Sequence, residues 1–483
     1  MLDSVEENDV QPPRGRCVGR FAARCVAYRR QLLTSMCLSG LFCLAMSAHA
    51  DGLMALYSQA LEHDPTYRAA LAERNAGREE RAIGRAALLP RLSYQYQAGS
   101  NHSVVAQPAL FGGVTTADRN YRSYTSALTL QQPLLDYEAW SRYHYGVAQA
   151  HHADERFRSR SQELAVRVAK AYTGALYAHD QIELSRAQER AYAELLTLNR
   201  RMLDAGEGTR TDVLETQARH DLAVAQEIEA RDALDAALRE LGAMVGRTIL
   251  IENLAPLSSP FRELAIEHAD FDQWRNMALA QNPELSAQRH ALDAAQQRIE
   301  QARAGHFPSV SLYATAGRQK SSSEATYDQR YQTNSIGLQV SIPIFAGGGV
   351  SASVRQAVEQ LEQQRYEGNA RQAEILNGLR QQFNLFRSSA AKMRAYQYAV
   401  DSARELTRAM QKSVAGGERV NADVLQAEQQ YYDASRNLAQ ARYAYLLSWM
   451  TLRLHAGVLE PKDIQAVDRF FALQPDRRRA ALP

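Results

Sequence analysis

The segment Pro90–Ala98, which reads PRLSYQYQA, recurs 218 residues later as Pro308–Ala316, which reads PSVSLYATA. After the proline of each copy, every second side chain is apolar or aromatic, and the side chains between them are mostly polar. Because side chains alternate between the two faces of a β-strand, this pattern predicts a strand with one apolar and one polar face. A second alternating run follows each copy and ends near Pro133 and Pro343. The chain is therefore expected to contain four strands.

Two long blocks without proline follow these strands, at 134–255 and 344–460. In the first block, apolar residues are spaced by four and three, which predicts coiled-coil helices; they are Leu164, Val168, Ala171, Ala175, Ala178 and Ile182. The helical pattern of each block is broken once, at Gly206 and Gly208 in the first and at Gly416 and Gly417 in the second, which predicts the turn of a helical hairpin. A helix over 136–205 would be roughly 100 Å long.

The repeated order of elements indicates an internal tandem duplication. Each copy is expected to contain an opening helix, two strands and a long helical hairpin. The two copies and a C-terminal tail are expected at 51–265, 266–460 and 461–483. The opening helices are predicted over Leu53–Leu88 and Phe271–Ala304. The segments that join the paired strands, Ser100–Arg122 and Gly317–Gln332, are rich in Gly, Ser, Thr and Asp, and are predicted to be exposed loops.

The first fifty residues, 1–50, have the features of a secretory signal peptide with a long leader. Basic residues at 29 and 30 precede an apolar run, Leu32–Met46, and the small-residue site Ala48-His49-Ala50 follows it. The run has about fifteen residues, fewer than the twenty or so that a membrane-spanning helix needs. We therefore expect the mature chain to begin near Asp51. All four cysteines precede this point, which excludes disulfides and thiolate metal sites from the mature chain.

The composition and motifs of the mature chain do not support an enzyme or a nucleic-acid-binding protein. Removing the first fifty residues leaves 50 basic and 50 acidic residues, so there is no excess positive charge for nucleic acid. The chain lacks the Walker A lysine after glycine, the HExxH metalloprotease motif and the GxSxG nucleophile motif. We predict no catalytic residues, no cofactor and no metal site.

A signal peptide together with alternating strands is typical of an outer-membrane β-barrel, whose strands need only about 9–11 residues each. Four strands cannot close a barrel, because an open edge in lipid leaves backbone groups unpaired and about eight strands is the practical minimum. Several chains must therefore share one barrel. Two chains would supply eight strands and three would supply twelve, and strand arithmetic does not choose between them.

Over essentially the whole mature chain, the sequence resembles the TolC family of outer-membrane channel-tunnel proteins. The resemblance rests on the two-copy order and on short motifs: Leu88-Leu89-Pro90, LQQPLLD at 130–136, SIPIF at 341–345 followed by Gly347-Gly348, and LAQARY at 438–443. It implies a homotrimer in a Gram-negative outer membrane, with a twelve-strand β-barrel and a tunnel of twelve helices that spans into the periplasm. It also implies a passive duct that a periplasmic adaptor, or membrane fusion protein, connects to an inner-membrane pump such as an ABC transporter.

The resemblance further implies that the two hairpin turns form the periplasmic tip. The start of each turn matches the region that adaptors contact, namely Gly206, Glu207, Gly417 and Glu418. Thr211 and Arg419 match a pair that holds the channel closed, and Asp212 and Asp423 match acidic residues at the entrance. Helix N-capping is an equally good interpretation of both aspartates.

Two positions at the tip depart from the family pattern. Val414 stands where the family has a gating tyrosine, and Gln426 stands where some members have a second ring-forming aspartate. Glu215 is a candidate for the missing charge.

From the resemblance we expect an outer-membrane exit duct of a tripartite export system. Type I protein secretion, with toxin-like cargo, is favoured over small-molecule efflux by the similarity around Leu134–Glu138. A soluble periplasmic coiled-coil adaptor or scaffold is the rival from another class, and it does not account for four alternating strands. The apolar strand face is expected to meet outer-membrane lipid through Leu92, Tyr94, Leu128, Leu312, Leu338 and Val340.

Overall fold

The computed structural model describes residues 52–108, 112–258, 261, 264, 269–322 and 326–471. The chain divides into two units, Met1–Ala50 and Asp51–Pro483, and all elements named below belong to the second. The predicted signal peptide, the predicted start at Asp51 and residues 472–483 of the predicted tail lie outside the described residues.

Two helices, rather than the single predicted helix, precede each pair of strands. The four helices are α2 (Leu53–His63), α3 (Pro65–Ala86), α6 (Phe271–Gln281) and α7 (Pro283–Arg303). The breaks come at Pro65 and Pro283, because proline has no N–H for the preceding turn and instead begins a new helix. Asp64 and Asn282 cap the new helices through side-chain oxygens. The prediction of continuous helices was therefore wrong at equivalent positions of both repeats.

The four predicted strands form one antiparallel sheet in the order β1-β2-β3-β4. They are β1 (Arg91–Pro108), β2 (Val114–Leu135), β3 (Ser309–Lys320) and β4 (Arg330–Ser341). β1 and β2 stay paired as far as Pro108 and Val114, so the loop predicted over 100–122 is mostly strand. The side chains there form no apolar face, so the sequence pattern does not predict a strand. The backbone hydrogen bonds between β1 and β2 nevertheless maintain one. Both ends of the second predicted loop, 317–320 and 330–332, are likewise strand.

Two long helical hairpins follow the strand pairs, as predicted. They are α4 (Tyr137–Asp204) with α5 (Arg210–Val245), and α8 (Gly349–Ala415) with α9 (Asn421–Ala456). α4 has 68 residues, which corresponds to about 100 Å of helix. The short helix α10 (Pro461–Asp468) follows α9, and short 3-10 turns occupy Ile251–Asn253 and Ala304–His306. Among the described helices, none combines the length and the apolar character that crossing a membrane requires.

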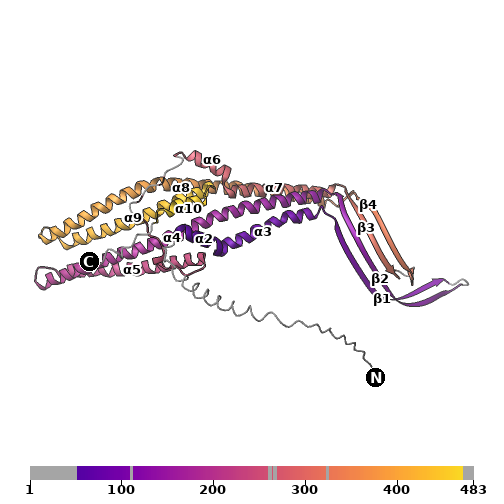
Figure 1. Cartoon of the computed structure of the whole chain (residues 1–483), viewed down its shortest axis with the longest axis horizontal. Coiled ribbons are helices and arrows are strands. Elements are labelled where there is room, and N and C mark those ends of the chain that lie inside the picture. Colours follow the sequence, from indigo (N-terminus) through magenta and orange to yellow (C-terminus); the bar gives the residue numbers. More distant parts are fainter. Residues whose placement is uncertain are drawn as a thin grey trace, which may run out of the picture. The chain divides into compact units, whose positions relative to one another are not determined.

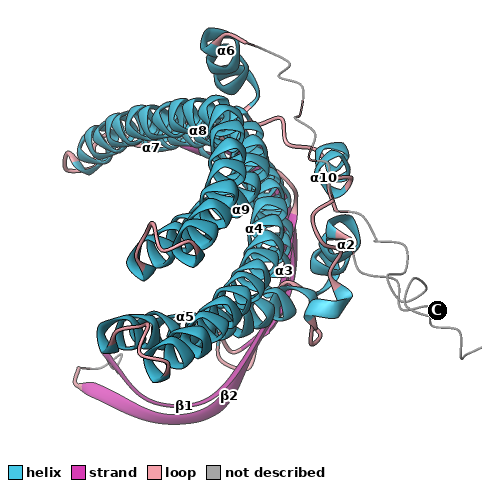
Figure 2. Ribbon diagram, turned by 90° about the vertical axis from the view of Figure 1, so that its left-hand side faces the viewer, coloured by secondary structure: helices cyan, strands magenta, loops and turns pink. Residues whose placement is uncertain are grey.

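The long helices lie side by side in a curved layer (Figure 2). Within it, α4 contacts α3, α5, α7 and α9, and α8 contacts α7 and α9. The short helices α2, α6 and α10 lie on the convex side of the layer. The sheet extends from one end of the long helices, and the turns of both hairpins lie at the opposite end (Figure 1). The length of the helices therefore separates the sheet from the hairpin turns.

Candidate functional site

The two hairpin turns share one backbone conformation, although they are separated by 211 positions in the sequence. Gly206 and Gly417 have φ angles of 81° and 75°, which glycine adopts without steric cost. The next residue, Glu207 or Glu418, donates its N–H to the carbonyl oxygen five residues earlier, at 2.9 Å in both turns. The predicted glycine turns are therefore present in both hairpins.

The helices that leave these turns begin differently. Thr209 caps α5: its hydroxyl oxygen accepts a hydrogen bond from Asp212 N (3.1 Å), and the Asp212 carboxylate accepts one from Thr209 N (3.2 Å). This reciprocal arrangement is a capping box. The equivalent residue before α9 is Val420, whose side chain has no acceptor atom. For Asp423 the structure shows an ion pair with Arg419 at 3.7 Å in place of the predicted cap.

The ion pair between Arg419 and Asp423 is exposed, with 58% and 37% of the two side chains accessible. A pair this exposed contributes at most about 1 kcal/mol. The predicted lock between Thr211 and Arg419 would join neighbouring hairpins, and it stays a prediction. The entrance roles of Asp212 and Asp423 likewise stay predictions.

A buried polar cluster, which the sequence analysis missed, joins the two hairpins just behind their turns. Asn199 of α4, Thr216 of α5 and Asn421 of α9 are 5%, 0% and 7% exposed. The Asn199 amide nitrogen donates to Thr216 Oγ1 (2.8 Å) and to Asn421 Oδ1 (3.1 Å), and the Asn421 amide nitrogen donates to Thr216 Oγ1 (3.2 Å). The Thr216 hydroxyl donates to the Asp212 carbonyl oxygen (2.7 Å), which completes its bonding capacity. We call these three residues the inter-hairpin cluster.

One signal for this cluster was present in the sequence. Asn199 continues the buried stripe of α4 beyond Ile182 at helical spacing. A polar residue in such a stripe indicates a specific partner across a coiled coil. The partners themselves were not predictable, because Thr216 and Asn421 lie in other helices, 17 and 222 positions away.

A buried carboxyl group lies on α9, about two helical turns beyond Asn421, and near Tyr192 of the apolar group formed by Tyr192, Ala223 and Leu425. Glu428 of α9 is 7% exposed, and its carboxylate accepts a hydrogen bond from Gln411 Nε2 of α8 (3.0 Å). Burial raises the pKa of Glu428, and the amide of Gln411 offsets this only in part. An ionised Glu428 therefore opposes close packing of the helices around it.

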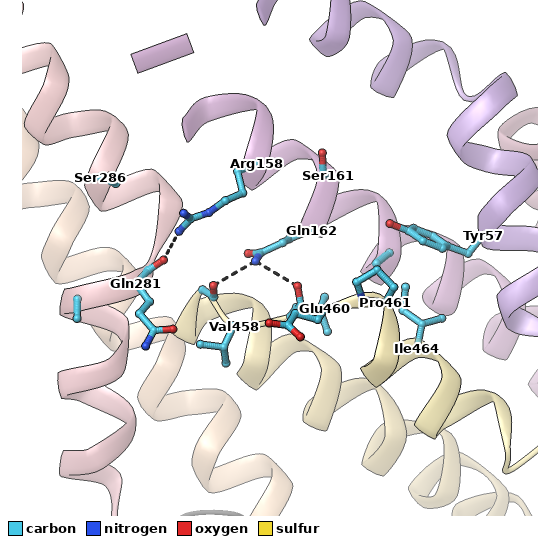
Figure 3. A pocket seen from close by; sticks show the side chains of 14 residues that line it. Tyr57, Arg158, Ser161, Gln162, Gln281, Ser286, Val458, Glu460, Pro461 and Ile464 are labelled. Atoms are coloured by element: carbon cyan, nitrogen blue, oxygen red, sulfur yellow. Dashed lines mark hydrogen bonds between the residues drawn. The ribbon is translucent and has the colours of Figure 1, made fainter. Parts of the chain in front are cut away.

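A pocket of about 560 Å³ lies far from the turns, where α2, α4 and the link between α9 and α10 meet (Figure 3). Gln162 of α4 donates to the carbonyl oxygens of Gly457 (3.1 Å) and Leu459 (3.2 Å). Arg158, one turn away, donates to the carbonyl oxygen of Gln281 at the end of α6. Figure 3 shows both side chains reaching from α4 to these segments. The Gln162 amide nitrogen and the Arg158 guanidinium thus connect α4 to neighbouring segments, which is a structural role.

The six residues predicted to face lipid lie on one face of the sheet. Paired residues in an antiparallel sheet point to the same side, and so do residues two apart on one strand. The pairs that connect the six are Leu92–Leu130, Tyr94–Leu128, Gln132–Leu312, Leu312–Leu338 and Val310–Val340. We call this side of the sheet the apolar face. That it meets lipid stays a prediction.

Comparison with known proteins shows which family has this sequence and fold. The family model described as "Outer membrane efflux protein" matches residues 56–247 and 274–458. The alkaline protease secretion protein AprF of Pseudomonas aeruginosa is 52% identical over 452 residues, which cover 93% of this chain and 94% of that protein. The proteases secretion protein PrtF of Dickeya chrysanthemi is 45% identical and covers 89% and 93%. The outer membrane protein TolC of Escherichia coli is 28% identical and covers 90% and 88%.

Solved structures of outer-membrane channels share the fold. The channel OprN matches with a TM-score of 0.73 at 20% identity, over 84% of this chain and 89% of that chain. VceC of Vibrio cholerae matches with a TM-score of 0.70 at 18% identity, over 84% and 96%. At these identities the likeness shows the fold alone.

Proposed function

The chain belongs to the outer membrane efflux protein family, and from this premise we propose that it is the outer-membrane exit duct of a type I protein secretion system. The observation that carries the proposal is the similarity to AprF and PrtF, whose names refer to protease secretion, at 52% and 45% identity. A relative named for efflux, TtgC of Pseudomonas putida, is 25% identical. Protein cargo is therefore favoured over small molecules.

We infer a homotrimer from membership of this family, and the sheet is compatible with it. Within the described residues, β1 and β4 each have a strand neighbour on one side only. In a sheet of four antiparallel strands the first and last run in opposite directions, so β4 of one copy can pair with β1 of the next without a change of pattern. Three copies would supply twelve strands and close the barrel, and the long helices would continue it as the periplasmic tunnel.

The hairpin turns are then the entrance of the duct. We propose that a periplasmic adaptor contacts Gly206, Glu207, Gly417 and Glu418, and that an ABC transporter in the inner membrane supplies the cargo and the energy. Thr211, Asp212, Arg419 and Asp423 would form the gate. The duct itself would be passive, without a catalytic reaction of its own.

Secretion restored in a bacterium that lacks its own outer-membrane channel tests this function. The chain is produced together with the ABC transporter, the adaptor and the protease of a type I protease secretion system, and protease activity in the medium is measured. We expect secreted protease and unchanged resistance to antimicrobial compounds. A chain without residues 1–50 is the control, because it should not reach the outer membrane. Restored drug resistance without secreted protease would instead support small-molecule efflux.

A further inference from the structure

The apolar face changes composition at the end of the sheet remote from the helices. Along β3 its residues are Val310, Leu312, Ala314 and Ala316, followed by Arg318 and Lys320. Along β4 the corresponding order is Val340, Leu338 and Ile336, followed by Asn334, Gln332 and Arg330. On β2 the apolar part of this face is followed by Tyr124 and then Arg122. We call Arg122, Arg318, Lys320 and Arg330 the rim cluster.

The register brings these cations together. Lys320 pairs directly with Arg330, and Tyr124 of β2 pairs with Lys320 on its other side. Arg122 and Arg318 lie two residues away along their strands and therefore on the same face. Like charges directly opposite each other destabilise a sheet. The rim cluster is therefore a patch of positive charge on this face of the sheet.

Acidic groups within the sheet offset little of this charge. Across the four strands as the structure describes them, Asp118 is the one acidic residue, and it pairs with Val104 beyond the level of the rim cluster. Asp328, in the segment between β3 and β4, lies 3.2 Å from Lys320 Nζ but is 75% exposed. Arg318 and Arg330 are exposed as well.

The distance of the rim cluster from the helical end of the sheet matches the thickness of the apolar layer of a membrane. From Val310 to Lys320 a strand advances about 34 Å, or about 26 Å along the barrel axis at a tilt of about 40°. The apolar band of such barrels is about 25 Å tall. Tyr94, Tyr96 and Tyr124 lie on the same face below or beside the cations, as in the aromatic girdles that mark a membrane surface. Because the helices leave from the other end of the sheet, this edge is the outer one.

We propose that the rim cluster binds the phosphate groups of the phosphorylated glycolipid in the outer leaflet, that is, of lipopolysaccharide. The guanidinium groups of Arg318 and Arg330 would each bond a phosphate through two parallel N–H groups, and Lys320 would add a point charge between them. The site rests on the proposed barrel, with its apolar face toward lipid. It adds a specific lipid contact to that function.

Binding of lipid A to the purified, detergent-solubilised full-length mature protein tests the proposal. The probes are bis-phosphorylated lipid A, dephosphorylated lipid A and inorganic phosphate. We expect the variant Arg318→Ser/Lys320→Ser/Arg330→Ser to bind bis-phosphorylated lipid A roughly tenfold more weakly or worse, since one lost charge-assisted bond already has this effect. Arg91→Ser is the matched control, because Arg91 lies on the opposite face and should leave binding unchanged. Lys320→Ser and Arg330→Ser are measured singly as well, so that the answer does not depend on assembly of the triple variant.

Three outcomes would overturn the proposal. They are equal affinity of the wild-type and variant oligomers for bis-phosphorylated lipid A, equal affinity of the wild type for the dephosphorylated lipid, and binding of inorganic phosphate as tight as that of the lipid. Protease secretion by the same variants measures the proposed transport function independently of lipid binding. Failure of the proposed function would appear as absent secretion with lipid binding intact, whereas failure of this inference would leave secretion intact without phosphate-dependent binding.

Discussion

The side-chain amides of Asn199 and Asn421 meet at 3.1 Å in a buried position, although they belong to different hairpins. Each hairpin ends in its own free turn, so this bond and its neighbours at Thr216 fix the spacing between the two turns of one chain. A movement that separates the hairpins near the tip must break these bonds and leave polar groups unpaired.

Replacing Asn421 should loosen the tip. Asn421→Ala removes two hydrogen bonds from the inter-hairpin cluster and leaves Asn199 and Thr216 partly unsatisfied, which should cost about 1–3 kcal/mol. We expect faster proteolysis at the turn around Gly206 in the assembled protein. Asn377→Ala is the control, because Asn377 is exposed on α8. Equal cleavage of both variants would show that the cluster does not hold the hairpins together.

Arg419 is predicted to hold the closed state through the neighbouring hairpin. Arg419→Ser should then raise single-channel conductance in planar bilayers, because two states separated by a few kcal/mol respond measurably to the loss of one set of bonds. If Arg419 acts only on Asp423 in its own turn, the loss is that of an exposed ion pair and conductance stays at the wild-type level. That result, with barrel and oligomer intact, would rule out the lock.

Glu428 should make stability depend on pH. Its pKa in the folded chain is raised by burial above the ordinary value of 4.5, so the folded chain retains a proton that the unfolded chain releases. Stability therefore falls as pH rises from about 4.5 through the folded-state pKa, and the whole penalty is present above it. Glu428→Gln keeps an acceptor for Gln411 and should melt higher than the wild type at pH 7, with the difference shrinking on acidification.

Thermal unfolding of both proteins between pH 4.5 and 8 checks this prediction. The groups that face Glu428 are Gln411 of α8, Tyr192 of α4 and Tyr432 of its own helix. Glu418→Gln, at the exposed hairpin turn, is the control and should not change the profile. A pH-independent difference for Glu428→Gln would attribute its effect to packing instead.

Alanine substitution at two glycines of α4 should have opposite effects on stability. A Cβ atom at Gly146 would clash with the carbonyl oxygen of Glu80, because α3 and α4 approach closely there, whereas nothing lies within 4 Å of a Cβ at Gly174. Gly146→Ala should cost about 1–3 kcal/mol. Gly174→Ala should stabilise by about 0.5–1 kcal/mol, because alanine favours the helix. Melting temperatures of the two variants check the contrast, and a shift of the same sign in both would contradict it.

Arginine on the two faces of β4 should distinguish lipid from lumen. Leu338 lies on the apolar face and Gln339 on the other. If the apolar face meets lipid, Leu338→Arg near mid-membrane costs about 2–4 kcal/mol, and Gln339→Arg costs little. The amount of heat-modifiable oligomer on a gel measures the difference. Equal loss at both positions would refute the orientation.

The sequence predicted strands and long helices where one local pattern repeats without interruption. Alternation at Leu92–Ala98 and heptad spacing from Leu164 onward are such patterns, and the structure has β1 and α4 there. The extension of β1 to Pro108 carries no such pattern, since its pairing depends on backbone groups that every sequence supplies. The breaks at Pro65 and Pro283 were marked by an Asp-Pro and an Asn-Pro pair, but helical spacing on both sides suggested continuity.

The hairpin tip shows which features local sequence patterns predict and which they do not. Gly206 and Gly417 identified both turns correctly, because positive φ is a property of a single residue. The inter-hairpin cluster needs three helices in fixed relative positions, and the burial of Glu428 depends on α4 and α8 as well as α9. Such properties follow only from tertiary packing.

The two hairpin turns have one backbone shape, but they differ at one pair of equivalent positions. Thr209 secures the first turn of α5, whereas Val420 leaves that of α9 without a side-chain acceptor. Such a cap is worth about 1 kcal/mol, so the backbone amides at 421–424 should exchange with solvent several-fold faster than those at 210–213. In a ring that alternates the two hairpins, every second one would then fray more readily. In the proposed trimer, opening would proceed through the α8–α9 hairpins while the α4–α5 hairpins keep their geometry, so the ring would dilate without losing its symmetry.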